Sequence, residues 1–315
     1  MDTYHGHDGP VVVIGASSLD VVGKLNAALT PETSNPAQIR SSFGGVARNV
    51  AENLARLGQA VALLSVVGKD RIGDELLQHT AEAGVDVSRV HRTDKFPTSF
   101  YMGVVGVDGK KEFAFDDMRI ADELSEAYVT YHEDMISAAS LLFIDANVPS
   151  QTMARAIEIA RYSGIPICAD PTSVVLSPHL FPYLKEINII VPSASEASAL
   201  LLQSIDPNDI DQALQAARHL VSLGVDEAFI SIGENGLCYA SSETSGHVPG
   251  FYSEIKDPTG AGDALTAAVL FSHLNQIAID DAAKLAISAA AITMRYQGTV
   301  DPDISLEKLY DELPN

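Results

Sequence analysis

Residues 257–264 read DPTGAGDA and lead directly into the helix-like run ALTAAVLFSHL at residues 264–274. Glycine lacks a Cβ atom, so Gly260 and Gly262, on either side of Ala261, allow backbone N–H groups to converge on one point. The helix that follows adds its free N–H groups and the positive end of its dipole. These features predict an anion hole for a phosphoryl group, with the Asp263 carboxylate beside it as a proton acceptor. The same letters also suit a tight turn in which Asp263 only caps the helix.

Strand-like apolar runs alternate with helical patterns along most of the chain. The helical patterns include residues 46–58 and 151–164, and the strand-like runs are at 11–15, 61–68, 141–147, 165–170, 187–192 and 226–233. Strands separated by helices are typical of βαβ units. We therefore expect an α/β fold in which helices cover both faces of a parallel sheet.

One region interrupts this alternation. Residues 98–117 contain two β-rich runs joined by VDGKK, in which Asp108-Gly109 is a hairpin signal. Residues 38–45 also resemble a strand. These segments predict a small second sheet beside the main one. Because no repeat, low-complexity tract or linker divides the sequence, we expect one domain over residues 1–315.

Composition excludes several partners. The 315 residues carry a formal net charge of −22, which opposes binding to nucleic acid or to an anionic membrane, although backbone N–H groups can still bind a small phosphate. No signal peptide and no membrane-spanning apolar run is visible. The two cysteines, Cys168 and Cys238, lie in apolar runs and are expected to be buried free thiols, which suits the reducing cytoplasm.

Four segments together resemble a known family. DPTGAGDA is similar to the C-terminal signature of the PfkB, or ribokinase-like, carbohydrate kinases. FGGVARNVAENLARLG (residues 43–58) resembles their N-terminal signature, and SVVGKDRIGDELL (65–77) and GASSLDVV (15–22) also follow the family pattern. The resemblance extends over nearly the whole chain. It implies a ribokinase-like three-layer α/β/α fold with a mostly parallel central sheet and a small β lid formed by about residues 21–45 and 97–118.

The resemblance also implies roles for individual residues. Asp263 matches the catalytic base, and residues 260–262 match the anion hole. The positions that hold sugar hydroxyls correspond to Asp20, Gly44, Gly45 and Asn49. The nucleotide loop corresponds to SIGENG, with Ser231, Gly233 and Gly236 near the phosphates of ATP, and Thr259 is assigned to the same cofactor.

Metal binding is implied at two positions, with two departures from the family pattern. Glu196 matches an acid that places Mg²⁺ through water, but Ser193 stands where relatives often have Asn. Asp257, like Thr259, matches residues near a monovalent cation site, which implies K⁺. Ribokinases themselves carry a Lys after the Gly-Gly pair, where this chain has Val46, so a simple free-ribose assignment is weakened.

Within the family, the chain is similar to the pseudouridine kinase branch at residues 34–58, at the lid hairpin 97–118 and at 145–147. This implies transfer of phosphate to the 5′-hydroxyl of a nucleoside, with Ser99, Tyr101, Asp117 and Asn147 as further substrate contacts. A sugar or adenosine kinase, and a catalytically silent nucleoside- or sugar-binding regulator, remain as alternatives. Retention of the base together with its anion hole favours an enzyme over the regulator. The lid also leaves open a homodimer formed through it.

Overall fold

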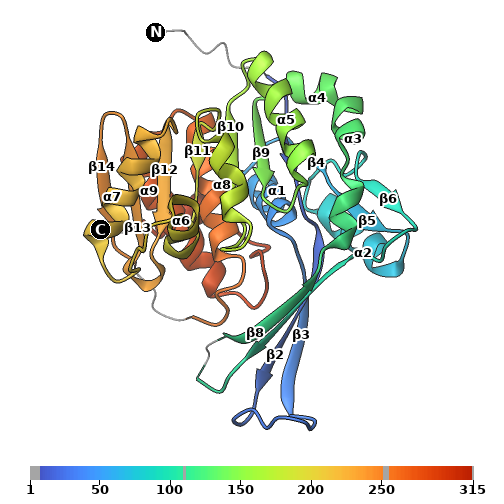
Figure 1. The fold of residues 1–315 in the computed structure, drawn as a ribbon. Helices are drawn as coiled ribbons and strands as arrows, with labels where there is room; N and C mark the ends of the chain where they lie inside the picture. Colours follow the sequence, from blue (N-terminus) through green and yellow to red (C-terminus); the bar gives the residue numbers. More distant parts are fainter. Residues whose placement is uncertain (1–7, 109–110, 251–254, 314–315) are drawn as a thin grey trace.

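A computed structural model describes residues 8–108, 111–250 and 255–313 (Figure 1). Its centre is an eight-stranded sheet in which six neighbouring strands run parallel and the last two form an antiparallel edge. In spatial order the strands are β14 (Ser245–Val248), β13 (Leu237–Ser241), β12 (Glu227–Ser231), β11 (Ile189–Ile190), β10 (Ile167–Asp170), β9 (Leu141–Asp145), β1 (Val11–Ile14) and β4 (Val61–Leu64). The predicted parallel sheet is confirmed.

Helices cover both faces of this sheet because alternate strand residues are apolar on each side. Val11 and Val13 of β1 belong to one buried cluster, while Val12 and Ile14 belong to another. The first cluster is covered by α1 (Val46–Arg56), α2 (Arg71–Glu82), α8 (Ala261–Leu274), α9 (Ile279–Met294) and α10 (Leu306–Asp311). The second is covered by α3 (Glu126–Tyr131), α4 (Glu133–Ser137), α5 (Ser150–Tyr162), α6 (Ala194–Leu201) and α7 (Ile210–Ser222). The molecule is therefore a three-layer α/β/α sandwich, as predicted.

A second, four-stranded sheet projects from the sandwich (Figure 1). Its order is β3 (Ala37–Gly44), β2 (Ser18–Leu25), β7 (Ser99–Val105) and β8 (Lys111–Asp117), with β2 and β7 parallel and the outer pairs antiparallel. The predicted small sheet is thus present, and it begins at Ser18, slightly before residue 21. The Asp-Gly hairpin signal falls partly on residues 109–110, which lie outside the described residues.

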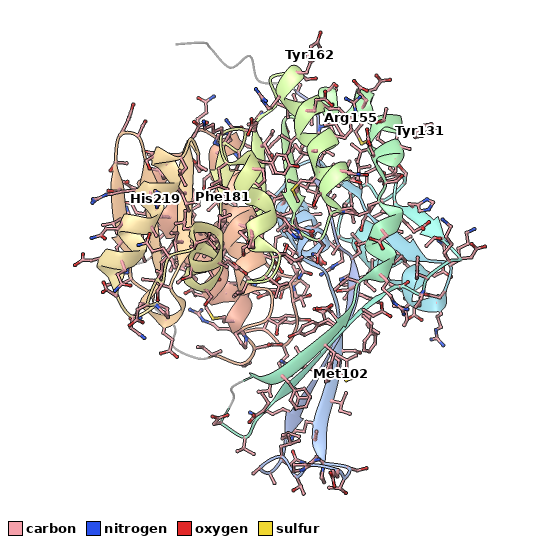
Figure 2. All side chains as sticks on the ribbon, in the orientation of Figure 1. Met102, Tyr131, Arg155, Tyr162, Phe181 and His219 are labelled. Carbon is pink, nitrogen blue, oxygen red and sulfur yellow. The ribbon has the colours of Figure 1, made fainter. Side chains whose placement is uncertain are left out.

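The strand register divides the projecting sheet into a polar and an apolar face. Side chains in one cross-strand row share a face, and the next row faces the other way. One row contains Ser42, Asp20, Tyr101 and Asp116, and the neighbouring row contains Ser41, Val21, Met102 and Phe115. The apolar rows leave Ile39, Met102 (labelled in Figure 2) and Phe115 exposed.

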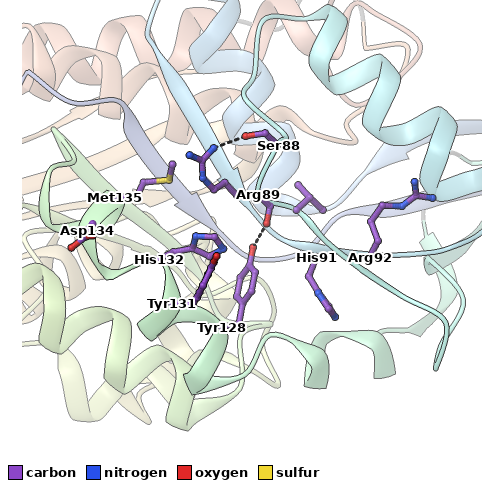
Figure 3. Close-up of a pocket in the computed structure, with 10 residues that line it drawn as sticks. Ser88, Arg89, His91, Arg92, Tyr128, Tyr131, His132, Asp134 and Met135 are labelled. Atoms are coloured by element: carbon purple, nitrogen blue, oxygen red, sulfur yellow. Dashed lines mark hydrogen bonds between the residues drawn. The ribbon is translucent and has the colours of Figure 1, made fainter.

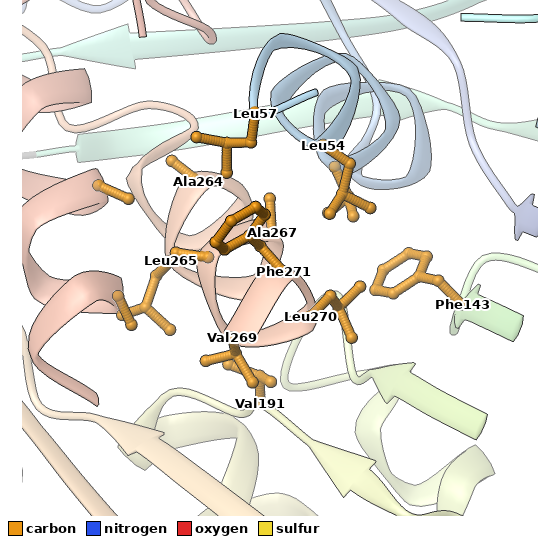
Figure 4. Close-up of a cluster of buried hydrophobic side chains, with 14 of the residues drawn as sticks. Leu54, Leu57, Phe143, Val191, Ala264, Leu265, Ala267, Val269, Leu270 and Phe271 are labelled. Atoms are coloured by element: carbon orange, nitrogen blue, oxygen red, sulfur yellow. The ribbon is translucent and has the colours of Figure 1, made fainter. Parts of the chain in front are cut away.

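Helices α1 and α8 lie side by side in the first apolar cluster (Figure 4). Leu54 and Leu57 of α1 face Ala264 and Ala267 of α8 in the figure. Small residues on α8 permit this close packing, and a hydrogen bond between Asn49 and Asp263 shows that the first turns of the two helices also meet.

Smaller elements complete the fold. The strand-like run 61–68 is divided into β4 and β5 (Val66–Gly68), and β5 pairs with β6 (His91–Thr93) instead of extending the central sheet. Three 3₁₀ helices are η1 (Arg119–Glu123), η2 (Ser177–Tyr183) and η3 (Gly233–Asn235). Both cysteines are buried free thiols, as expected.

Candidate active site

The start of α8 brings the DPTGAGDA residues into the predicted arrangement. Gly260 is the N-cap of the helix, with a left-handed backbone (φ 81°), and Asp263 lies in the first turn, half-buried. A Cβ atom on Gly260 would lie 1.9 Å from the Thr299 carbonyl oxygen, so glycine is required there by packing. Gly262 is different, because a Cβ atom there would meet nothing within 4 Å. The open space beside Gly262 is where an anion would approach the free N–H groups of the helix.

The start of α1 lies against the same point. Its N-cap is Gly45 (φ 92°), and Asn49 lies one turn into the helix. The side-chain Nδ2 of Asn49 donates a hydrogen bond to Oδ2 of Asp263 over 2.6 Å. Residues 214 positions apart in the sequence therefore meet at one carboxylate.

The environment of Asp263 suits a general base. Burial raises the pKa of Asp263 to about 7; the hydrogen bond from Asn49 opposes the shift, as does the charge of Arg48, whereas the nearby carboxylates of Asp20 and Asp145 add to it. A base with a pKa near neutral pH is ionised under working conditions and still binds a proton well. The Asp263 carboxylate is held by the side chain of Asn49 from another helix, a contact that capping of α8 does not require.

Asp20 lies on the polar face of the projecting sheet, and its carboxylate is near enough to Asp263 to raise the pKa of Asp263. Ser18 donates a hydrogen bond to Oδ1 of Asp20 over 2.7 Å, and Asp20 is 8 % exposed. A Cβ atom on Gly44 would lie 2.1 Å from the Asp20 carboxylate, so Gly44 is a glycine because this acid occupies the space. The register also places Ser99 and Tyr101 on this face, next to Ser18 and Asp20.

Asp117 does not lie on this face. It falls in the row of Phe100, on the apolar side of the sheet, and its carboxylate pairs with Arg119 over 2.7 Å. Strand residues alternate between faces, so the preceding residue, Asp116, occupies the row of Asp20 and Tyr101. Asp117 therefore faces away from the row of Asp20 and Tyr101, and Asp116 is the acid of β8 that lies in that row.

Two buried acids complete the cluster and were not selected from the sequence. Asp145 ends β9 and accepts hydrogen bonds from the backbone N–H groups of Ala16, Ala47 and Asn147. Asp170 ends β10, and burial together with the charges of Glu196, Asp263 and Asp145 raises its pKa well above the ordinary value. Both follow buried strand runs, LLFID and ICAD, and carboxyl ends of parallel strands meet at one edge of the sheet. That signal was available in the sequence.

The residues near Glu196 fit a divalent cation. Ser193 and Glu196 form a capping box at the start of α6, in which the Ser193 N–H donates to Oε2 of Glu196 over 2.7 Å. Ser193 in place of Asn thus serves the helix start. The Asp170 and Glu196 carboxylates repel one another electrostatically, and carboxylate oxygens are the donors that Mg²⁺ prefers.

The Asp257 carboxylate, which is expected to lie near a monovalent cation, is paired with an arginine in this arrangement. Its Oδ2 is paired with Arg40 of β3 over 2.7 Å, and its Oδ1 accepts a hydrogen bond from the Thr259 N–H over 3.1 Å. Both oxygens are therefore engaged, and a guanidinium already supplies positive charge. The expectation of K⁺ at Asp257 has no support from these contacts.

The predicted nucleotide loop follows β12, with Ser231 at the end of the strand. Gly233 has a left-handed backbone (φ 61°), and a Cβ atom there would meet nothing within 4 Å. By contrast, a Cβ atom on Gly236 would lie 2.1 Å from the Val248 carbonyl oxygen. Gly233 thus leaves room for a ligand, whereas Gly236 is required by the packing of the edge strands.

A separate cavity of about 700 Å³ shares no residue with this site (Figure 3). It lies between the loop before β6 and helices α3 and α4, where the Tyr128 hydroxyl donates a hydrogen bond to the Arg89 carbonyl. Within the described ranges, no helix is long and apolar enough to cross a bilayer, and no group of three or more metal-binding side chains is found.

Comparison with known proteins decides the family. The model of the pfkB family of carbohydrate kinases matches residues 9–305. This chain belongs to the pfkB family. The kinase is 28 % identical to the pseudouridine kinase of Escherichia coli over 97 % of its length and 96 % of the relative's. It is 27 % identical to the guanosine-inosine kinase of Exiguobacterium acetylicum over 89 % of its length and 93 % of the relative's.

Solved structures show the same fold. The kinase superposes on Arabidopsis thaliana ribokinase, solved with ribose and ATP, with a TM-score of 0.82 over 96 % of this chain and 98 % of that one. The two sequences are only 18 % identical, so this likeness concerns the ribokinase fold alone. Membership of the pfkB family is therefore shown. The sequence relatives do not decide which acceptor this kinase phosphorylates, because they are named for different acceptors.

Proposed function

We propose that this kinase transfers the γ-phosphate of ATP to the 5′-hydroxyl of pseudouridine. The observation that carries the proposal is the meeting of Asp263, Asn49 and Asp20 beside the open start of α8. A hydroxyl-bearing substrate, a base and an anion hole are the parts that phosphoryl transfer to an alcohol requires. The resemblance to pseudouridine kinases at residues 34–58 and 97–118 supports pseudouridine as the acceptor.

Each residue group has a part in this reaction. Asp20, Asn49 and the backbone at Gly44 and Gly45 would hold the ribose hydroxyls, and Asp263 would accept the proton of the 5′-hydroxyl as it attacks. The free N–H groups at the start of α8 would stabilise the charge on the transferred group. Mg²⁺, held near Glu196 and Asp170, would neutralise phosphate charge. The loop at residues 231–236 would bind the nucleotide. Thr259 is assigned here to the same nucleotide, and Asn147 to the acceptor.

Recognition of the nucleobase must come from the polar face of the projecting sheet, because the ribose contacts suit any nucleoside. Pseudouridine differs from uridine by an additional ring N–H. A carboxylate on the row of Asp20 and Tyr101 can accept a hydrogen bond from it, and Asp116 occupies that row. A site that bonds a donor rejects an analogue lacking it far better than an apolar wall does.

The test is kcat/KM for pseudouridine, uridine, adenosine, guanosine and ribose. We expect pseudouridine to lead, and Asp116→Asn to lower the pseudouridine-to-uridine ratio. The matched control is Asp117→Asn, which changes the neighbouring acid on the opposite face and should leave the ratio unchanged. A tenfold preference for ribose or adenosine would contradict the acceptor while leaving the kinase intact. An unchanged pseudouridine-to-uridine ratio in Asp116→Asn would contradict only the role of Asp116 in recognising the nucleobase.

We also propose that the projecting sheet is a lid that closes over the acceptor. Closure would exclude water, which competes as a phosphoryl acceptor. Support comes from the position of Asp20, Ser99 and Tyr101 on the face that carries the site. Hydrogen exchange with and without acceptor should show added protection at residues 18–25 and 99–105; equal exchange in both states would argue against a lid.

The apolar face of the lid is assigned to a second copy of the chain. Ile39 is 75 % exposed, Phe115 63 % and Met102 40 %, and they form one patch. Two chains of net charge −22 repel elsewhere, so a contact through this nearly uncharged face is the favourable one. Phe115→Glu should convert a dimer to a monomer in light scattering; a wild-type monomer would refute the assignment. The buried free thiols suit a cytoplasmic enzyme.

A further inference from the structure

Arg48 is fully buried, with 1 % of its side chain exposed, and it lies immediately before Asn49 on α1. Its guanidinium donates to five partners. The donor atoms reach the carbonyl oxygens of Gly44 (3.1 Å) and Phe43 (2.8 Å) and the hydroxyl of Thr299 (3.2 Å). The other two partners are Oε2 of Glu52 and Oδ1 of Asn49. A buried guanidinium with this many fixed partners holds one orientation.

The bond to Asn49 has a specific consequence. An amide side chain has one oxygen that accepts and one nitrogen that donates, and a guanidinium only donates. Because Arg48 donates to Oδ1, the Asn49 amide must turn Nδ2 toward the other side, where it meets Oδ2 of Asp263. A reversed amide would place two donors together at Arg48 and two acceptors together at Asp263.

We infer that Arg48 is a positioning residue: it fixes the Asn49 amide in the orientation that holds Asp263, and it joins that amide to the end of lid strand β3. Thr299 adds a further contact to the end of β3, since its hydroxyl also donates a hydrogen bond to the Phe43 carbonyl oxygen over 2.5 Å. Thr299 is the residue whose carbonyl packs against Gly260 at the start of α8. One guanidinium thus contacts the end of β3, its own helix α1 and Thr299, and the Thr299 carbonyl in turn packs against Gly260.

The charge of Arg48 also acts on Asp263. Among the groups around that carboxylate, Asp20 on β2, Asp145 at the end of β9 and Asp170 at the end of β10 oppose its ionisation. Burial is the largest cause of the raised pKa of Asp263, and Arg48 works in the opposite direction. Removing the charge of Arg48 should therefore move the ionisation of Asp263 to higher pH.

Arg56 provides the matched control. It lies on the same helix and pairs with the same acid, Glu52, over 2.7 Å, but its other bond is to the Pro302 carbonyl and not to Asn49. Glu52 keeps partners when Arg48 is replaced, because Arg56 and His79 both contact it. Loss of Arg48 thus does not leave the buried carboxylate of Glu52 without a counter-charge, and Arg48→Met is expected to fold.

The experiment measures kcat and kcat/KM across about pH 5 to 9 for Arg48→Met, Arg48→Lys and Arg56→Met, with the best acceptor of the panel. Arg48→Met should lower kcat by about 10- to 100-fold, as misplacement of reacting groups does, and shift the acidic limb of the profile to higher pH. Arg48→Lys keeps the positive charge but lacks the planar guanidinium, so it should lower kcat and leave the acidic limb of the pH profile at its wild-type pH. Arg56→Met should keep the wild-type profile.

The outcomes separate this inference from the proposed function on which it rests. If Arg48→Met keeps the wild-type kcat and acidic limb and only loses stability, Arg48 is structural and the inference is overturned. The same follows if Arg56→Met shifts the limb equally. If Arg48→Met does not fold, Arg48→Lys decides, because an unchanged kcat there overturns the role. If Asp263→Asn is fully active, Asp263 is not the base, and both the proposed mechanism and this inference fail.

Discussion

Helices α1 and α8 both start at a glycine with positive φ, but the first turn of α8 contains a further glycine, Gly262, in a different environment. Gly45 and Gly260 are packed against protein, since a Cβ atom would lie 2.4 Å from the Ala16 carbonyl oxygen in the first case and 1.9 Å from that of Thr299 in the second. Gly262 faces open space. Both N-caps are therefore closed by neighbouring backbone, whereas the first turn of α8 has open space beside Gly262.

The polar residues in the first turns differ in the same way. Asn49 on α1 is 3 % exposed and fixed by two bonds, to Arg48 and to Asp263. Asp263 on α8 is half-buried beside the open space. Under the proposed function, α1 would supply a rigid support and α8 would supply the reacting group. Four predictions can break or sharpen this division.

The largest effect is expected for Asp263→Asn, which keeps the shape and removes the proton acceptor. We expect kcat to fall by about 10²–10⁴-fold, the usual contribution of a positioned general base. A saturating assay with the best acceptor measures it. Near-wild-type turnover would mean that α8 does not supply the base.

Next in size is the dependence on pH. The base acts only when ionised, and the pKa of Asp263 is raised to about 7, chiefly by burial. Activity should therefore rise about tenfold for each pH unit on the acidic side of this value and level off above it. The profile of kcat/KM measures it, with thermal unfolding at each pH as the control. A rate that is flat from about pH 5 would contradict the environment assigned to Asp263.

A smaller effect is expected from Gly262→Ala. Alanine favours a helix over glycine by about 0.5–1 kcal/mol, so the melting temperature should rise slightly. The added Cβ atom enters the space of the transferred phosphoryl group, so kcat should fall by about tenfold, less than the loss of an anion-hole donor. Gly45→Ala is the contrast, because it should lower stability. Full activity in Gly262→Ala would show that the open space is not used.

The smallest effect is expected for potassium. The segments that lead into the two helices are joined by the Arg40–Asp257 ion pair, so the guanidinium already neutralises the acid. Replacing K⁺ with a large organic cation should change kcat by less than about twofold, which is far less than the fall expected when the general base is removed. In Arg40→Gln the acid loses its partner, and activity should then respond to K⁺. A wild-type enzyme that requires K⁺ would contradict this reading.

Much of the fold was readable from the sequence, because buried parallel strands are continuous apolar runs and their helices end at glycines. The site was readable where chemistry depends on local spacing, as in residues 260–263. Asp116 was missed because a strand residue can be assigned to a face only when its register is known. Arg48 was missed because a charged residue on a helix normally faces solvent, and its burial depends on contacts as distant as Thr299. The pair of Arg40 and Asp257 is equally non-local.

The projecting sheet joins the sandwich at one end and carries a loop at the other (Figure 1). Strands β2 and β3 pair in unbroken register from Ser18, opposite Gly44, to Leu25, opposite Ala37, and the connection beyond them spans residues 26–36. A loop that changes length there leaves every row of the polar face in place, because register is set by the paired strands and by the anchors near Gly44. The tip is therefore the place at which a fluorescent label or a short peptide can be grafted to test whether the projecting sheet moves when the acceptor binds.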